Sequence, residues 1–348
     1  MPDTKQRIEW IDIAKGLGII LVIAGHTIAL RYSSWLYAFH MPLFFFLSGL
    51  VYSQRKYDNY GLFFGVKAKQ ILFPWSIFFL IALVVCLIIP PWREGLSIHQ
   101  ILIELYTANS NNIQNSSIWY LVCMFVTLNL FYFVDKVKRT RLIIAIFIIF
   151  AIMVLWIKKI LLLSEGFVAL PEGRLPFKMD SALLALVFLA SANWNKGRIM
   201  KAISNWKYGW MGLVFFAVVL LGMSFFNGWT NINSLDCGNI KLLYYPIAFL
   251  GIFVVCVFSK LVSESKFVSL KKILLFYGKN SLLIFGLQSL FIRIYLLVFN
   301  EMQNLNMELY MNNPPIHQIG SFIIVSFVVS PIVVCLKNLA KKRLPAYG

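Results

Sequence analysis

A lysine and a histidine stand eleven residues apart in a segment that is otherwise apolar enough to cross a membrane. They are Lys15 and His26, in the segment 11–30. Eleven residues of α-helix return to within about 20° of the starting direction and rise about 16 Å, so both side chains share one helix face at two depths. Ionisable groups inside a bilayer persist mainly where they line a cavity or do chemistry. The spacing therefore predicts a polar shaft with a titratable group at its far end.

A second histidine, His40, begins the next apolar segment, near the same membrane face as His26 because the connection between them is short. Imidazole is the usual general base for a hydroxyl or amine acceptor, since its pKa lies near neutral pH. Pro42 frees a backbone carbonyl in the same segment, which a membrane protein tolerates beside a cavity. An interfacial hydrogen bond would explain either histidine alone, whereas two histidines above Lys15 indicate catalysis. The candidate catalytic residues are His26, His40 and Lys15.

Basic residues that follow the second apolar segment are candidates for binding phosphates. Lys67 and Lys69 could hold phosphate groups as point charges, together with Lys15 at the mouth of the shaft. The alternative is that they only anchor the topology of the chain. Asp12 stands three residues before Lys15, so the two can pair on one helix face.

Four further residues are candidates for substrate binding. Asp180 is an acid inside an apolar segment, and Arg174 precedes it on the outer side. Trp119 fits an interfacial aromatic belt as well as a ligand platform. Ser48 lies in the segment of His40 and permits close helix packing. The sequence has no Cys-x-x-Cys pair that would indicate a metal site, and we expect no metal.

The composition is that of a membrane protein. The chain has 348 residues, of which 60% are hydrophobic, and its mean hydropathy is +0.77, whereas soluble domains are about 45–50% apolar. We therefore predict an all-α polytopic membrane bundle that forms a single domain over residues 1–348, with about ten transmembrane helices. The predicted spans are 11–30, 36–53, 71–91, 118–134, 142–160, 178–194, 208–226, 240–259, 281–299 and 319–336.

The distribution of basic residues predicts the orientation. With the N-terminus inside, the inner segments hold 23 of the 32 Lys and Arg residues, and the last outer loop (300–318) holds none. The positive-inside rule then places both termini in the cytoplasm. Contact with anionic lipid headgroups accounts for the net charge of +18, so we expect membrane lipids and no nucleic acid as partners.

The segments that carry these residues resemble a known family. IDIAKGLGIILVIAGH (11–26) and FHMPLFFFLSG (39–49) are similar to the start of the acyltransferase-3 family of integral membrane acyltransferases. The first span of that family carries a basic residue, ten further residues and then a histidine. Later segments are similar to family landmarks in the same order, and the resemblance covers nearly the whole chain. These later segments are 118–121, 175–177 with Asp180, and 278–282.

The resemblance implies a function and a location. Such relatives acetylate surface sugars, which implies acetyl-CoA from the cytoplasm as donor, in the bacterial plasma (inner) membrane. The implied acceptor is a surface glycan, such as O-antigen lipopolysaccharide or exopolysaccharide, or its lipid-linked oligosaccharide precursor. His26 would take the proton from the acceptor hydroxyl, and His40 would position the acceptor or stabilise the oxyanion. An acetyl-His26 intermediate is the competing mechanism.

Two departures from the family pattern and several alternative functions accompany this prediction. Many relatives have Arg-x-x-Arg where this chain has Lys67-Ala-Lys69-Gln70, and often a histidine where it has Gln288. A flippase or transporter of lipid-linked sugars would also use a polar shaft. The donor could instead be succinyl-CoA, and the acceptor peptidoglycan, an amine or a lipid. The sequence does not specify the sugar, the hydroxyl or the oligomeric state.

Overall fold

The computed structural model describes residues 8–27, 34–94, 96–136, 149–164, 174–303 and 315–343, and these are almost entirely helical. Among them, seven helical segments are long and apolar enough to cross a membrane. They confirm the predicted all-α polytopic bundle. The number of ten spans stays a prediction, since parts of the predicted spans 11–30 and 142–160 lie outside the described residues. The seven segments are Glu9–Thr27, Tyr60–Ile88, Ser116–Val134, Gly209–Asn227, Lys241–Glu264, Ser281–Val298 and Gln318–Leu339.

The centre of the bundle is formed by helices that bury most of their side chains. Helix α2 packs against α1, α10 and α13, and α10 also packs against α7. Helix α10 is shorter than the seven segments above, and neighbouring helices surround both α2 and α10. The bounds of these helices are α1 Glu9–Thr27, α2 Ser34–Val51, α7 Trp119–Val134, α10 Met179–Trp194 and α13 Tyr244–Glu264.

Close contact between α1 and α14 (Val268–Lys279) holds the helix that carries Lys15 and His26. A Cβ atom on Gly16 would lie 1.9 Å from the carbonyl oxygen of Leu274, and one on Gly278 would lie 1.9 Å from that of Asp12. Only glycine permits the two backbones to approach this closely. The position of α1, and with it the depth of Lys15, is therefore fixed by backbone packing.

The helix that carries the predicted third span, 71–91, begins earlier in the chain than that span. One continuous helical run extends from Tyr60 to Ile88 and consists of α3 (Tyr60–Lys67), a π-helix η2 (Ala68–Leu72) and α4 (Phe73–Ile88). Lysine is a good helix former, so the basic residues do not end the helix. Lys67 and Lys69 consequently lie within this helical run and not in a loop.

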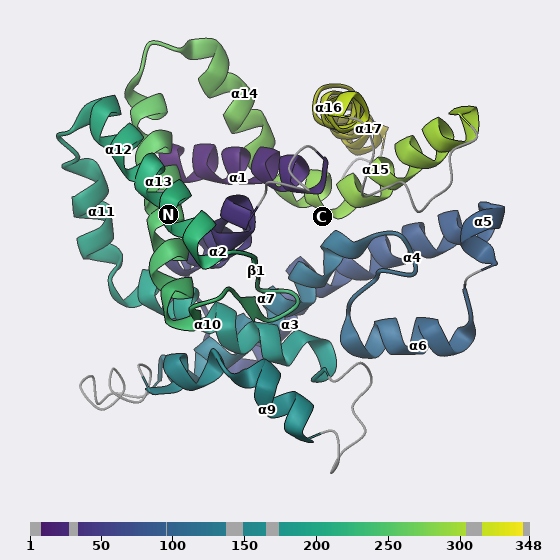
Figure 1. Ribbon diagram of the computed structural model, residues 1–348, viewed down its shortest axis with the longest axis horizontal. Coiled ribbons are helices and arrows are strands. Elements are labelled where there is room, and N and C mark those ends of the chain that lie inside the picture. The colour runs from purple at the N-terminus through teal and green to yellow at the C-terminus, as the bar shows by residue number, and fades with distance from the viewer. Residues whose placement is uncertain are drawn as a thin grey trace.

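The remaining elements surround this core. In Figure 1 the run α3–α4–α5 and the returning helix α6 extend to one side of the molecule, away from α11 and α12. A short hairpin pairs Thr230 with Cys237 and Asn231 with Asp236. These elements are η1 Gln54–Lys56, α5 Pro90–Arg93, α6 Ile98–Thr107, η3 Ser116–Ile118, α9 Ile157–Ser164, η5 Pro176–Lys178, α11 Lys196–Ser204, α12 Gly209–Asn227, β1 Thr230–Asn231, β2 Asp236–Cys237, η6 Lys241–Leu243, α15 Ser281–Gln303, α16 Pro315–Ile323, the π-helix η8 Ile324–Val329 and α17 Ser330–Arg343.

Candidate functional site

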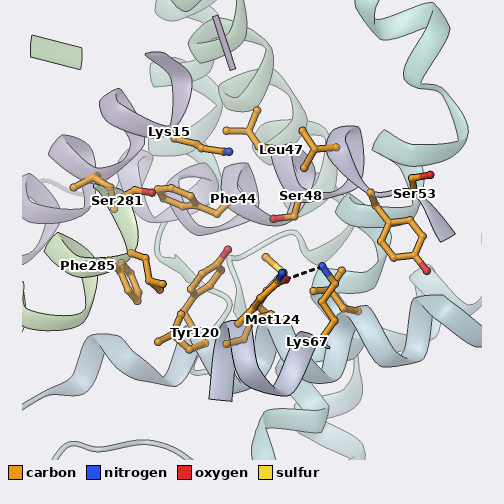
Figure 2. A pocket seen from close by; sticks show the side chains of 18 of the residues that line it. Lys15, Phe44, Leu47, Ser48, Ser53, Lys67, Tyr120, Met124, Ser281 and Phe285 are labelled. Carbon is orange, nitrogen blue, oxygen red and sulfur yellow. Dashed lines mark hydrogen bonds between the residues drawn. The ribbon is translucent and has the colours of Figure 1, made fainter. Parts of the chain in front are cut away.

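A cavity of about 350 Å³ contains Lys15, and we refer to it as the Lys15 cavity. Its walls come from α1, α2, α7, α15 and the run α3–η2, and most of them are apolar (Figure 2). Lys15, Ser48, Lys56 and Lys67 bring polar groups to it. The cavity thus combines an apolar lining with amines from α1, η1 and α3.

Lys15 and Lys67 each contact a neighbouring polar side chain. Lys15 Nζ lies 3.8 Å from Asp12 Oδ1, as the i,i+3 spacing predicts. Lys67 Nζ donates to Gln70 Oε1 at 3.3 Å and lies 5.7 Å from the centre of the Tyr57 ring. The contact of Lys67 with Gln70 is exposed and contributes little to folding, so this amine can turn toward an anionic ligand.

Lys69 does not share the cavity with Lys67. Its side chain lines a separate apolar groove with Trp75 and Phe177. Residues two positions apart on a helix point about 160° apart, which separates the two lysines once both are helical. The sequence grouped Lys67 with Lys69 at one mouth, whereas the structure places them in the walls of two different cavities.

A second, smaller cavity of about 180 Å³ brings His26, His40 and Trp119 together, and we refer to it as the histidine pocket. Side-chain amides and hydroxyls make up much of its remaining wall. These groups both donate and accept hydrogen bonds, which suits a ligand with several hydroxyls. The polar residues are Tyr37, Asn111, Ser116, Ser117, Asn231 and Asn233.

Hydrogen bonding fixes the tautomer of His40. Its Nδ1 lies 2.6 Å from the carbonyl oxygen of Leu36, which can only accept, so Nδ1 carries the proton. In the neutral ring Nε2 is therefore an acceptor. The Tyr37 ring packs edge-on against both imidazoles, with ring centres 4.8 Å from His40 and 6.3 Å from His26. The two histidines are thus held around one tyrosine.

Arg174 and Asp180 line neither of these two cavities. Arg174 Nε and a terminal nitrogen donate to the two carboxylate oxygens of Asp180 at 2.7 and 2.9 Å, and the second nitrogen also reaches Ser181 Oγ. Backbone N–H groups of Leu175 and Ser181 complete the bonding of the fully buried carboxylate. This pair holds the start of α10, and a substrate would have to break it to reach Asp180.

Lys178 is a functional candidate that the sequence analysis missed. Its ammonium is 1% exposed and donates to side-chain oxygens of Asn109 and of Asn233, the latter at 2.7 Å. It also lies 5.8 Å from the centre of the Trp119 ring. Because Asn233 and Trp119 line the histidine pocket, Lys178 connects two loops behind the wall of that pocket. Its left-handed φ of 59°, next to Phe177 at 52°, is rare for such residues and gives no sequence signal.

Two residues of α15 also lie near the histidine pocket. The sequence analysis did not name Arg293, and it noted Gln288 only as a departure from the family pattern. Arg293 lies close enough to His26 for their charges to interact, and an arginine inside an apolar segment is the signal that could have identified it. Gln288 is 2% exposed and donates to Ser117 Oγ at 3.5 Å, while its Oε1 has no partner among the described residues. An amide therefore borders the histidine pocket behind Ser117.

The structure keeps some predicted residues together and separates others. His26, His40 and Trp119 share the histidine pocket, while Lys15, Lys67 and Ser48 share the Lys15 cavity. The predicted single shaft is divided into these two spaces. Within the described part of the chain, no group of three or more His, Cys, Asp or Glu side chains could hold a metal ion.

Comparison with known proteins gives one family. A family model described as an acyltransferase domain matches residues 8–335, which include all the residues of both cavities. No match was found among curated proteins or among solved structures.

Proposed function

This chain belongs to the acyltransferase-3 family and is a multi-pass membrane acyltransferase, and from that premise we propose a specific reaction. It transfers an acetyl group from cytoplasmic acetyl-CoA to a hydroxyl of a cell-surface polysaccharide or of its lipid-linked precursor. The membrane is the bacterial inner membrane, where the acceptor is presented on the outer side.

The observation that carries this proposal is the placement of Lys15 and His26 in two different cavities along a single helix. A donor with anionic and uncharged ends suits such an arrangement. The phosphates of CoA would stay beside Lys15 and Lys67, because charged groups remain near water and cations. The slim pantetheine arm would follow the apolar wall toward the histidine pocket.

The pocket side chains supply the acid–base chemistry. His26 accepts the proton of the acceptor hydroxyl as the oxygen attacks the thioester carbon. The new C–O bond forms, the C–S bond breaks, and the proton passes from His26 to the leaving CoA sulfur. His40 Nε2 is an acceptor in the neutral ring, which favours positioning of the acceptor hydroxyl over stabilisation of an oxyanion.

The test is His26→Ala expressed in cells that carry the acceptor polymer, with His99→Ala as the matched control. His99 is exposed on α6 and lines neither cavity. Mass spectrometry of surface glycans should show loss of acetyl groups with the polymer retained, and His99→Ala should match wild type. Loss of the polymer itself would support the flippase, and normal acetylation by folded His26→Ala would disprove the proposed role of His26.

A further inference from the structure

The Lys15 cavity and the histidine pocket meet at one side chain. Phe285, on α15, is the residue that lines both, within the described part of the chain. It is only 4% exposed, although it faces an open space on each side. A buried ring normally has packed atoms on all sides, so a ring between two voids has room to change its rotamer.

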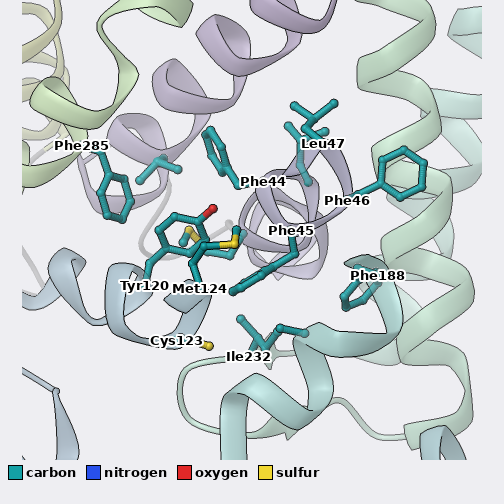
Figure 3. Close-up of a cluster of buried hydrophobic side chains, with 14 of the residues drawn as sticks. Phe44, Phe45, Phe46, Leu47, Tyr120, Cys123, Met124, Phe188, Ile232 and Phe285 are labelled. Atoms are coloured by element: carbon teal, nitrogen blue, oxygen red, sulfur yellow. The ribbon is translucent and has the colours of Figure 1, made fainter. Parts of the chain in front are cut away.

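The ring of Phe285 belongs to a wall of aromatic side chains (Figure 3). Its centre lies 5.2 Å from that of Tyr120, in an edge-to-face arrangement. Tyr120 packs in turn against Phe44 at 5.9 Å and Phe45 at 5.0 Å. Ser48, on α2, lines the Lys15 cavity together with Tyr120. The other members of the wall are thus held by several neighbours.

The backbone that carries Phe285 is fixed on its other side. A Cβ atom on Gly286 would lie 2.2 Å from the Phe78 ring, so α15 and α4 are in close contact there. Asn115 Nδ2 donates to the carbonyl oxygen of Gly286 at 2.9 Å. A side-chain rotation of Phe285 is therefore easier than a displacement of α15.

We propose that Phe285 is a movable partition between the two cavities and that it determines the length of the acyl group transferred. This inference rests on the proposed function, because the thioester must pass from the amines around Lys15 to His26. The space beside the ring and the pocket of about 180 Å³ must hold the acyl group and the acceptor hydroxyl together. An acetyl group fits this requirement, whereas each added methylene would meet the ring.

The same ring limits a side reaction. With Phe285 in the closed position and no acceptor bound, water in the histidine pocket is kept from the thioester. In hydrolysis a water oxygen would bond to the acyl carbon, the C–S bond would break, and acetate and CoA would form. A smaller side chain at this position should therefore increase CoA release in the absence of acceptor.

The experiment compares acetyl-CoA with butyryl-CoA as donors for the purified full-length protein in lipid nanodiscs, with acceptor-bearing lipid extract. Wild type, Phe285→Ala, Phe285→Leu and the control Phe291→Ala are compared. Phe291 packs against the same core from the same helix but lines neither cavity. A methylene contact in an apolar pocket commonly changes specificity by about 10-fold or more. We expect Phe285→Ala to raise the butyryl-to-acetyl ratio at least about 10-fold, Phe285→Leu less, and Phe291→Ala not at all.

Free CoA thiol, measured without acceptor, gives a second readout that does not need productive transfer. It should rise in Phe285→Ala and Phe285→Leu and stay at the wild-type level in Phe291→Ala. Unchanged donor ratios and unchanged thiol release in folded Phe285 variants would overturn the partition while leaving the proposed function intact. Absence of transfer from any acyl-CoA by wild type would overturn the proposed function, and the partition with it.

Discussion

The two cavities of this membrane acyltransferase are built by different means. In the Lys15 cavity, charge comes from amines on long side chains, with contacts of 3.8 Å for Lys15 to Asp12 and 3.3 Å for Lys67 to Gln70. In the histidine pocket, polarity comes from imidazoles on α1 and α2 and from amides in the connections between helices. Behind those connections lie a buried ion pair and the buried ammonium of Lys178.

The difference suits two kinds of ligand. Amines on long side chains attract phosphates over a long range, and this attraction depends little on direction. Hydroxyls are instead recognised by hydrogen-bond donors and acceptors that are fixed in direction. Salt should therefore weaken binding in the Lys15 cavity more than in the histidine pocket. Mutations behind the histidine pocket should disturb its geometry, while those around the Lys15 cavity should change donor affinity with the fold intact.

The largest effect is expected from breaking the ion pair behind the histidine pocket. Arg174→Ala leaves the buried Asp180 carboxylate without its bidentate partner, and such a loss typically costs about 3–5 kcal/mol. Thermal unfolding in detergent should show a clear fall in stability. The control is Lys67→Gln, whose hydrogen bond to Gln70 is exposed and should contribute about 1 kcal/mol or less.

A double variant makes this prediction specific. Arg174→Ala with Asp180→Ala removes both charges and should be less destabilised than the sum of the single variants. Equal stability of Arg174→Ala and Lys67→Gln would show that the two regions do not differ in this way.

The sequence predicted the parts of the site that depend on spacing within one helix. The eleven-residue spacing places Lys15 and His26 along α1, and the short connection brings His40 to the same pocket as His26. Apolar length predicted the membrane bundle. These features follow from helix geometry and from the solvent properties of the bilayer, which act at the level of single segments.

The features that the sequence did not predict depend on contacts between distant segments. Phe285 is one of 31 phenylalanines, and nothing local marks it as the residue between two cavities. To predict that Lys67 and Lys69 point in different directions, one must know that the helix begins at Tyr60. That stretch is less apolar than a membrane span. The sequence indicated that Asp180 binds a ligand, whereas its carboxylate is bound by Arg174. Arg174 lies in a segment whose conformation no local pattern predicts, so this pairing was not expected.

An intermediate effect is expected from the ammonium that connects the loops of the histidine pocket. Lys178→Met leaves the side-chain oxygens of Asn109 and Asn233 without this donor, and Asn233 should shift in the pocket wall. We expect kcat/KM for the acceptor to fall about 10- to 100-fold at unchanged acetyl-CoA affinity, which corresponds to about 1.4–2.8 kcal/mol.

The matched control for that variant is Lys158→Met. Lys158 pairs with Asp236 of the adjacent hairpin, but 46% and 33% of the two side chains are exposed, so its loss should have little effect. An equal fall in acceptor kcat/KM for both variants, or a fall in donor affinity for Lys178→Met, would contradict the assignment of Lys178 to the histidine pocket.

The smallest effect tests the separation of the two lysines on the run α3–η2. Lys67→Gln removes one amine from the Lys15 cavity, while Lys69→Gln changes a side chain in the apolar groove beside Phe177. An exposed ionic contact is worth about 0.2–1 kcal/mol, so acetyl-CoA should bind up to about 5-fold more weakly to Lys67→Gln and normally to Lys69→Gln. Titration of purified protein at two salt concentrations should also show a weaker salt dependence for Lys67→Gln alone.

If both variants weaken donor binding equally, the amine of Lys69 reaches the donor despite its opposite helix face. If neither does, the lysines serve as topology anchors, and Lys15 and Lys56 are the lining amines of this cavity that remain to contact the phosphates.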